Sequence, residues 1–202
     1  MGTLYWHVLL SSNQQLREAA RTAHKRIAQF PGLHMTPLEW LHLTVLIAGP
    51  SNQISDLAMR DMLAIAQQSV LNAPPITVEL SKIIYHPEAI VLAAEPADSL
   101  NPILEAAKKA TQAVTGHAGT IGRSSSKWTP HVTLAYSTSI QPAEPIIAAL
   151  GKESVACNVT IDAFSLVIQQ GSEWLWKWSP VGTVSLAGSL GLRFSGHSPI
   201  SR

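Results

Sequence analysis

The sequence predicts an α+β fold built from two similar halves. Its 202 residues suit one domain, or two small lobes that fold as one unit. Hydrophobic residues make up 46% of the chain and charged residues 13%, which is a globular composition with enough apolar side chains for a sizeable core. Strand-like and helix-like segments follow one another in a similar order in both halves, and a short polar motif recurs in each half. We expect one two-lobed domain over residues 1–187 and a flexible tail over 188–202, where large apolar side chains are few.

The first predicted elements are a strand and a helix. Residues 4–11, LYWHVLLS, are typical of a buried strand. The apolar residues of 13–30 recur at the 4,3,4,3 spacing of an amphipathic helix. Prolines bound the segment 31–37, which predicts a loop.

A second strand and helix complete the first half. The apolar segment 41–48 is too short for a helix and therefore predicts a strand. Gly49 and Pro50 end it. Ser51 or Asn52 is then placed to cap a helix over about 53–71.

The middle of the chain predicts a hairpin and a helix. ITVELSKIIY and AIVLAAEP are typical of two strands that flank the turn HPE. Asp98 or Ser99 would cap the following helix, and Gly116 would end it.

The second half continues with a polar loop, a strand and a helix. Residues 117–127, HAGTIGRSSSK, are rich in glycine and serine and predict the loop. A strand is expected over 131–136, and a helix from Pro142 to Leu150 that Gly151 ends. The remaining stretches VACNVTIDAFSLVIQQ, EWLWKW and VGTVSL are strand-like.

The recurring motif is histidine, apolar residue, threonine, apolar residue. It reads HLTV at 42–45 and HVTL at 131–134, and each copy lies in a predicted strand. With 8 histidines and 13 threonines, composition alone gives about 0.1 such matches in the chain. Two matches in strands are therefore unexpected by chance. His34-Met35-Thr36 shares the first three positions, but Pro37 follows and the segment predicts a loop, so we treat it as unrelated.

The motif places one histidine and one threonine on the same side of each strand. Side chains at positions i and i+2 of a strand share a face, so His42 lies beside Thr44, and His131 beside Thr133. Facing each other across a cleft, the two imidazoles can pass a proton to and from the reacting oxygens, and the hydroxyls can bind a phosphate. This geometry suits in-line displacement at a phosphodiester. No metal or other cofactor is expected, because the motifs lack the further ligands that a metal site needs.

The two motifs resemble those of the two-histidine (2H) phosphoesterase superfamily, in particular its branch of 2′-5′ RNA ligases and RNA 2′,3′-cyclic phosphodiesterases. The order of the predicted strands and helices resembles that of the family over about residues 4–187, whereas the residues themselves match only at the two motifs. The resemblance implies a bilobal α+β fold with a central groove and metal-independent cleavage of a 2′,3′-cyclic phosphate. It also implies that His42 and His131 are the acid–base pair and that Thr44 and Thr133 bind phosphate. The resemblance favours His42 as acid and His131 as base, but the pseudo-symmetry of the two motifs leaves the opposite assignment open.

The sequence departs from this family at one position. Members commonly have an arginine shortly after the second motif, where this chain has Tyr136. Arg123 and Lys127, in the polar loop before the motif, are candidates to replace that phosphate ligand.

Several aromatic residues are candidates to stack on a nucleotide base, although packing in the core or at its rim is the preferred interpretation for each one singly. They are Trp6, Tyr85, Trp128 and Tyr136. Three further tryptophans, Trp174, Trp176 and Trp178, alternate along a predicted strand, so packing is the preferred interpretation there.

The expected function is hydrolysis of 2′,3′-cyclic phosphates at RNA 3′ ends or in small nucleotides, with 2′-5′ RNA ligation as the reverse reaction. Alternatives are a phosphodiesterase on another cyclic or nucleotide-derived ester, and a nucleotide- or RNA-binding protein without turnover. The formal net charge of +1 argues against a long nucleic-acid duplex as partner. Absence of a signal peptide and of a long apolar segment, with a single cysteine, predicts a cytoplasmic protein without a membrane partner, and we expect a monomer.

Overall fold

The computed structural model describes residues 2–121, 128–151, 155–171, 176–187 and 193–194. The strands are β1 (Thr3–Leu9), β2 (Leu33–Met35), β3 (His42–Pro50), β4 (Ile76–Tyr85), β5 (Ala89–Glu95), β6 (His131–Ser137), β7 (Cys157–Ile161), β8 (Ala163–Gln170), β9 (Lys177–Ser185) and β10 (Arg193–Phe194). The α-helices are α1 (Gln14–Ile27), α2 (Asp56–Ser69), α3 (Asn101–Thr115) and α4 (Ala143–Leu150). Short 3-10 turns occupy Leu38–Trp40, Ser51–Gln53 and Ala97–Leu100.

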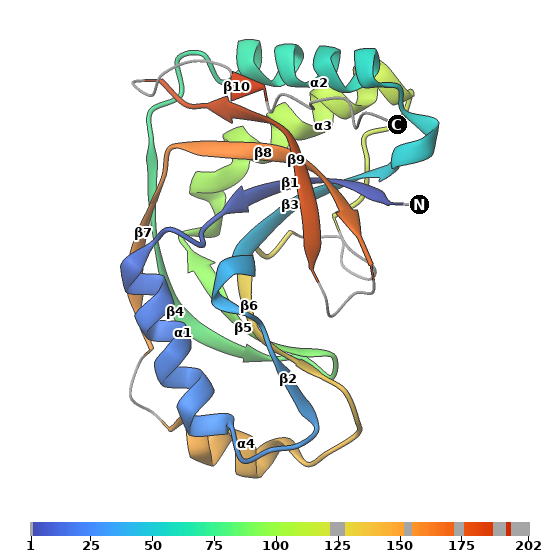
Figure 1. Ribbon diagram of the computed structural model, residues 1–202. Helices are drawn as coiled ribbons and strands as arrows, with labels where there is room; N and C mark the ends of the chain where they lie inside the picture. Colours follow the sequence, from blue (N-terminus) through green and yellow to red (C-terminus); the bar gives the residue numbers. More distant parts are fainter. Residues whose placement is uncertain (1, 122–127, 152–154, 172–175, 188–192, 195–202) are drawn as a thin grey trace.

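The described strands form one curled antiparallel sheet in the order β10-β9-β8-β1-β3-β6-β5-β4-β7, with β2 on the side of β6 (Figure 1). The sheet is narrowest at its centre, where β3 and β6 share a single residue pair, Leu43 with Val132. This junction divides the molecule into two lobes. The first lobe holds β1, β3, β8, β9 and β10, and the second holds β2, β4, β5, β6 and β7.

Helices cover one face of each lobe. α2 and α3 pack against each other and against β9 and β3 of the first lobe, whereas α1 contacts β6, β7 and α4 in the second lobe. Figure 1 shows α2 and α3 together at the end of the molecule opposite α4. The chain therefore passes back and forth between lobes, and the two halves of the sequence do not coincide with the two lobes.

The helix ends follow local sequence signals. The Asn13 side chain accepts the Leu16 amide and begins α1, and Ser55 accepts the Ala58 amide at the start of α2. Ser55 replaces the predicted cap at Ser51 or Asn52, because those residues form a 3-10 turn first. Gly116 ends α3 in a left-handed conformation, with φ of 80°, as predicted.

Two other expectations were wrong in detail. The segment 31–37 contains the strand β2, which pairs with β6 about a hundred residues later in the chain. Three residues are too few to show a periodicity, so this partner could not be foreseen. The helix expected from Asp98 or Ser99 begins at Asn101, because a 3-10 turn occupies those residues.

The long stretch 155–170 is two strands. It divides at Asp162 into β7, which pairs with β4, and β8, which pairs with β1, so the division sends the chain from one lobe to the other. The predicted hairpin is confirmed as β4 and β5. In the predicted tail, Arg193 and Phe194 pair with β9, and the other residues from 188 onward lie outside the described part. No helix in the described residues is long and apolar enough to cross a membrane.

Candidate active site

The two motifs meet at the junction between the lobes. Leu43 and Val132, the second residues of the motifs, are direct partners of β3 and β6, and both side chains lie in the core. Since neighbouring side chains of a strand point to opposite faces, the histidines and threonines emerge together on the other face. In the antiparallel register, His42 lies beside Thr133 and Thr44 beside His131. The four side chains are thus related by a local two-fold axis through the Leu43–Val132 pair.

The fourth motif residue has the same structural role in both copies. The pairing of β1 with β3 skips Val45, and the pairing of β5 with β6 skips Leu134. Each motif therefore ends in a β-bulge, which bends its strand and shifts the alternation of side chains by one residue. Both bulge residues are buried, which accounts for the apolar residue at this position.

Both histidines are held by the same hydrogen bond. His42 Nδ1 donates to the carbonyl of Trp40, and His131 Nδ1 donates to the carbonyl of Thr129, each at 2.7 Å. The bond fixes each ring and the tautomer, so the lone pair of each neutral imidazole is on Nε2. Those Nε2 atoms are the ones available for proton transfer.

Burial makes the two histidines weak bases to different degrees. Desolvation lowers the pKa of His42 to about 4, opposed by the bond to Trp40 and reinforced by repulsion from His131. The His42 side chain is only 5% exposed. Desolvation also lowers the pKa of the less buried His131, opposed by the bond to Thr129 and reinforced by repulsion from His86. Both rings are therefore neutral in the free protein at pH 7.

The threonine hydroxyls remain available for a ligand. Thr44 is half-buried and Thr133 is buried, and in the described part of the chain neither hydroxyl makes a hydrogen bond. Two hydroxyl donors and two imidazoles thus share one face. That set can hold a phosphate between two groups able to transfer protons.

An aromatic cluster surrounds His42. The His42 ring centroid lies 4.4 Å from that of His7 and 4.8 Å from those of both Trp176 and Trp178. We expected the tryptophans only to pack and assigned His7 no role. The alternation of Trp176 and Trp178 is a usable signal, but nothing local indicates that these two rings contact His42. Trp174 lies outside the described residues.

His7 has an unusual environment within this cluster. It is fully buried, and in the described structure neither of its ring nitrogens has a hydrogen-bond partner. Desolvation, together with repulsion from His42, lowers its pKa well below 6.5. His7 is therefore a neutral ring packed under His42.

Tyr136 reaches the site because of the bulge at Leu134. The shift in alternation brings Tyr136 to the face that carries His131 and Thr133. Its ring stacks on that of Trp176 at 6.2 Å, a contact between the two lobes. Tyr136 thus lies near the motifs, and its contact with a substrate stays a prediction.

The other predicted aromatic residues have different positions. The indole N–H of Trp128 donates to the Thr44 carbonyl at 3.3 Å, which places Trp128 beside the motifs. Tyr85 packs against the core on the opposite face of β4 from Ile84, away from the motif side chains.

Trp6 belongs to the core of the first lobe. It is fully buried, contacts Phe164 and donates its indole N–H to the hydroxyl of Thr111 on α3. This burial contradicts the prediction that Trp6 contacts a substrate: it faces the helices, whereas its neighbour His7 faces the site. Arg123 and Lys127 lie outside the described residues. Within the described part, no group of three or more His, Cys, Asp or Glu side chains could hold a metal ion.

The sequence matches one protein family over most of its length. Residues 13–173 match the model of the 2′-5′ RNA ligase superfamily, a range that contains both motifs. The comparison with curated proteins gave no significant match.

Solved structures share the whole fold at low sequence identity. TT0787 of Thermus thermophilus superposes with a TM-score of 0.72 at 21% identity, over 93% of this chain and 100% of that one. LigT of E. coli in its apo form superposes with a TM-score of 0.65 at 16% sequence identity, over 92% of this chain and 98% of LigT. A phosphoesterase structure superposes with a TM-score of 0.64 at 17% sequence identity, over 93% of this chain and 99% of that one. Other structures similar to this chain are of LigT complexed with phosphate, 3′-AMP, ATP or NADP+.

Proposed function

Because this chain belongs to the 2′-5′ RNA ligase superfamily, we propose that it is a phosphodiesterase that opens 2′,3′-cyclic phosphates at RNA 3′ ends or in small nucleotides. The family indicates a phosphoesterase- or ligase-type enzyme. The observation that carries the finer proposal is the two-fold arrangement of the motifs at the Leu43–Val132 pair. It places both imidazoles and both threonine hydroxyls on one face of the sheet, with each Nδ1 already bonded to a carbonyl. Such a set of groups supports binding of one phosphate.

The reaction needs one proton acceptor and one proton donor. A water oxygen attacks the phosphorus while one histidine takes its proton through Nε2. The bond from phosphorus to one ribose oxygen then breaks, and the other histidine protonates that oxygen, leaving a phosphate monoester. Thr44 and Thr133 donate hydrogen bonds to the non-bridging oxygens, whose negative charge develops in the transition state.

Burial supports one assignment of these roles. A base must be neutral and an acid protonated, and His42 is the more deeply buried ring, with a pKa of about 4. A single proton shared by the pair therefore resides mainly on His131. This supports His42 as base and His131 as acid, the reverse of the assignment that the family resemblance implies.

Known ligands of a similar structure support a nucleotide substrate. E. coli LigT has been crystallised with phosphate and with the nucleotides 3′-AMP, ATP and NADP+. The same site run in reverse would join an RNA 5′-hydroxyl to a cyclic phosphate and form a 2′-5′ bond. Water at about 55 M favours hydrolysis unless the two RNA ends are held together.

The test is turnover of 2′,3′-cyclic mononucleotides and of a short RNA that ends in a cyclic phosphate, in the presence of EDTA. We expect His42→Ala and His131→Ala each to lower kcat/KM by about 100-fold or more. His117→Ala, which removes an exposed histidine, is the matched control and should stay within about 2-fold. A wild-type protein that binds these ligands without turnover would instead be a nucleotide-binding protein, and turnover of only another phosphodiester would place the enzyme on a different substrate.

A further inference from the structure

A lysine lies in line with His131 on the open face of the second lobe. Lys82 of β4 pairs with Ala93 of β5, and Ala93 pairs with His131 of β6. Direct cross-strand partners share a face of the sheet, so these side chains form one row that leads away from the phosphate site. Ile84, Val91 and Thr133 form the next row.

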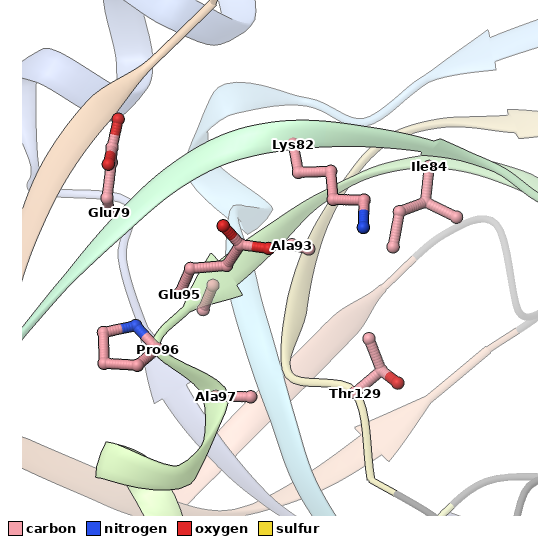
Figure 2. A pocket seen from close by; sticks show the side chains of 9 residues that line it. Glu79, Lys82, Ile84, Ala93, Glu95, Pro96, Ala97 and Thr129 are labelled. Carbon is pink, nitrogen blue, oxygen red and sulfur yellow. The ribbon is translucent and has the colours of Figure 1, made fainter.

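This row borders a pocket of about 500 Å³. Lys82 and Ile84 line it from β4, Ala93 and Glu95 from β5, and Thr129 from the segment before β6 (Figure 2). Figure 2 shows the Lys82 ammonium and the Glu95 carboxylate directed into the same opening. The small Ala93 side chain separates Lys82 from His131 and leaves this space free. Thr129 also accepts the hydrogen bond from His131, so the pocket directly adjoins the proposed catalytic site.

The charged side chains that line the pocket form no ion pair with one another or with other residues that the structure describes. Lys82 is exposed, and in the described structure it forms no ion pair within 4 Å, although Glu79 and Glu95 also line the pocket. Glu79 and Glu95 are cross-strand partners and form a separate row. The row of Lys82 lies between this row and the row of Ile84. The end of the pocket in line with His131 is therefore cationic, and the next row is anionic. A phosphate is attracted to the first position and repelled from the second.

The opposite side of the site offers a different surface. Beyond His42, the rings of His7, Trp176 and Trp178 are in contact with the His42 ring. The open pocket therefore lies on the His131 side of the pair, together with the exposed Lys82, which has no ion-pair partner among the described residues. A substrate that extends beyond the reacting phosphate has room there.

We propose that Lys82 binds the phosphate that joins the reacting nucleotide to the preceding one, so that the enzyme prefers an RNA chain end to a free cyclic mononucleotide. This proposal rests on the proposed function and specifies its substrate. Lys82 and His131 are two strand spacings apart, about 10 Å between backbones, and the flexible four-carbon stem of lysine covers much of that distance. Glu79 and Glu95 then face hydroxyl or amino donors of the nucleotide.

The path of the chain has a consequence for the chemistry. A nucleotide held between His131 and Lys82 brings its ribose to the His131 side. The leaving ribose oxygen is then next to His131, which protonates it, while His42 activates water from the enclosed side. The substrate path and the burial of His42 thus lead to the same assignment of roles.

The experiment compares kcat/KM for a short RNA ending in a 2′,3′-cyclic phosphate with kcat/KM for the cyclic mononucleotide, which lacks the preceding phosphate. We expect Lys82→Gln to lower the ratio of the two values on the order of 10-fold. It should also make the plot of log(kcat/KM) for the RNA against log(salt) less steep by about 0.7, the value for one phosphate contact on a single strand. Lys82→Arg should restore most of the ratio. Lys25→Gln removes an exposed charge on α1 and should change neither value.

An equal loss for both substrates, or no loss for either, would overturn the proposal. Failure of the proposed function is recognised separately, because wild-type protein would then turn over neither substrate. In that case, a binding titration with a short RNA that carries a 3′-phosphate still tests whether Lys82 binds a phosphate. Binding about 10-fold weaker in Lys82→Gln supports the phosphate site, and unchanged binding rejects it.

Discussion

At the scale of single residues, the two histidines have the same hydrogen bond and different burial. Their Nδ1 atoms both donate to a carbonyl two residues earlier, at 2.7 Å. The His42 ring is enclosed by aromatic rings, whereas His131 adjoins an open pocket. A symmetric motif thus becomes an asymmetric pair, which suits the proposed division into one acid and one base.

This asymmetry predicts an acidic optimum. In the free enzyme, the active form carries one proton on the pair. Below the pKa of His42, about 4, both rings are protonated and no base remains; above the pKa of His131, which lies below 6.5, both are neutral and no acid remains. A bell-shaped profile of kcat/KM for a cyclic mononucleotide should therefore peak between pH 4 and 6.5. A maximum above pH 7 would contradict this account.

The sequence was sufficient for the four motif residues and insufficient for their surroundings. The positions of His42, Thr44, His131 and Thr133 on one face follow from alternation within each strand. His7 could not be placed near His42, because that contact depends on how β1 pairs with β3. For the same reason the sequence left Trp6 open between stacking on a base and core packing, and the structure shows core packing. One residue of register decides which side chain faces the site.

At the scale of elements, the bulges show what a motif pattern hides. The apolar residue after each threonine looks like an ordinary core position, but the strand pairing skips it in both copies. A bulge needs a partner strand to be defined, so it cannot be found in a single segment of sequence. The same holds for β2, whose partner β6 begins about a hundred residues later.

The end of α3 offers a test of how a neighbouring loop is anchored to β3. Gly119 has φ of 74°, and a Cβ there would lie 2.7 Å from the carbonyl oxygen of Ile47. Thr120 and Ile47 exchange backbone hydrogen bonds of 2.8 and 2.9 Å at this point. Gly119→Ala should therefore combine backbone strain with a steric clash, and lower the free energy of unfolding by about 2–4 kcal/mol in urea titrations.

Gly116→Ala is the matched control. Gly116 has φ of 80°, but a Cβ there would meet nothing within 4 Å. Only the cost of a left-handed alanine remains, about 1–2 kcal/mol. Equal losses in the two variants would show that the contact with Ile47 is unimportant.

At the scale of the whole molecule, the sequence predicted the fold class and the pseudo-repeat but not the arrangement of lobes. Element order along the chain suggested that each half forms its own lobe. Instead α1 packs on the second lobe and α3 on the first, and the break at Asp162 separates β7 from β8. Helix-to-sheet packing across the molecule leaves no signal in local periodicity.

The buried histidines make the folded state sensitive to acid. In the folded state the pKa values of His7, His42 and His131 are lowered below 6.5, the ordinary value that these side chains have in the unfolded chain. At a pH between the lowered values and 6.5, the unfolded chain therefore binds more protons than the folded protein. The contribution of these neutral histidines to the free energy of unfolding is thus fully present above pH 6.5, and it is lost as the pH falls towards 4. The free energy of unfolding, measured in urea at several pH values, should decrease over this range.

His7→Phe isolates one contribution to this effect. Phenylalanine keeps an aromatic ring under His42 but cannot take up a proton on unfolding. The slope of unfolding free energy against pH should then decrease by up to about 1.4 kcal/mol per pH unit, the value for one proton. Equal m-values would confirm that both proteins unfold from the same structure. An unchanged slope would mean that His7 already binds a proton in the folded state.

The exchange of segments between lobes gives this chain the properties of a two-piece assembly. A cut between α3 and β6 would leave each fragment with one motif and neither fragment with a complete lobe, because β8 and β9 complete the sheet of β1 and β3, and β6 and β7 complete that of β4 and β5. Either sheet could then form only when the fragments meet. Activity of the mixture should rise with the product of the two fragment concentrations, which would make the enzyme a natural split reporter for proteins fused to its halves.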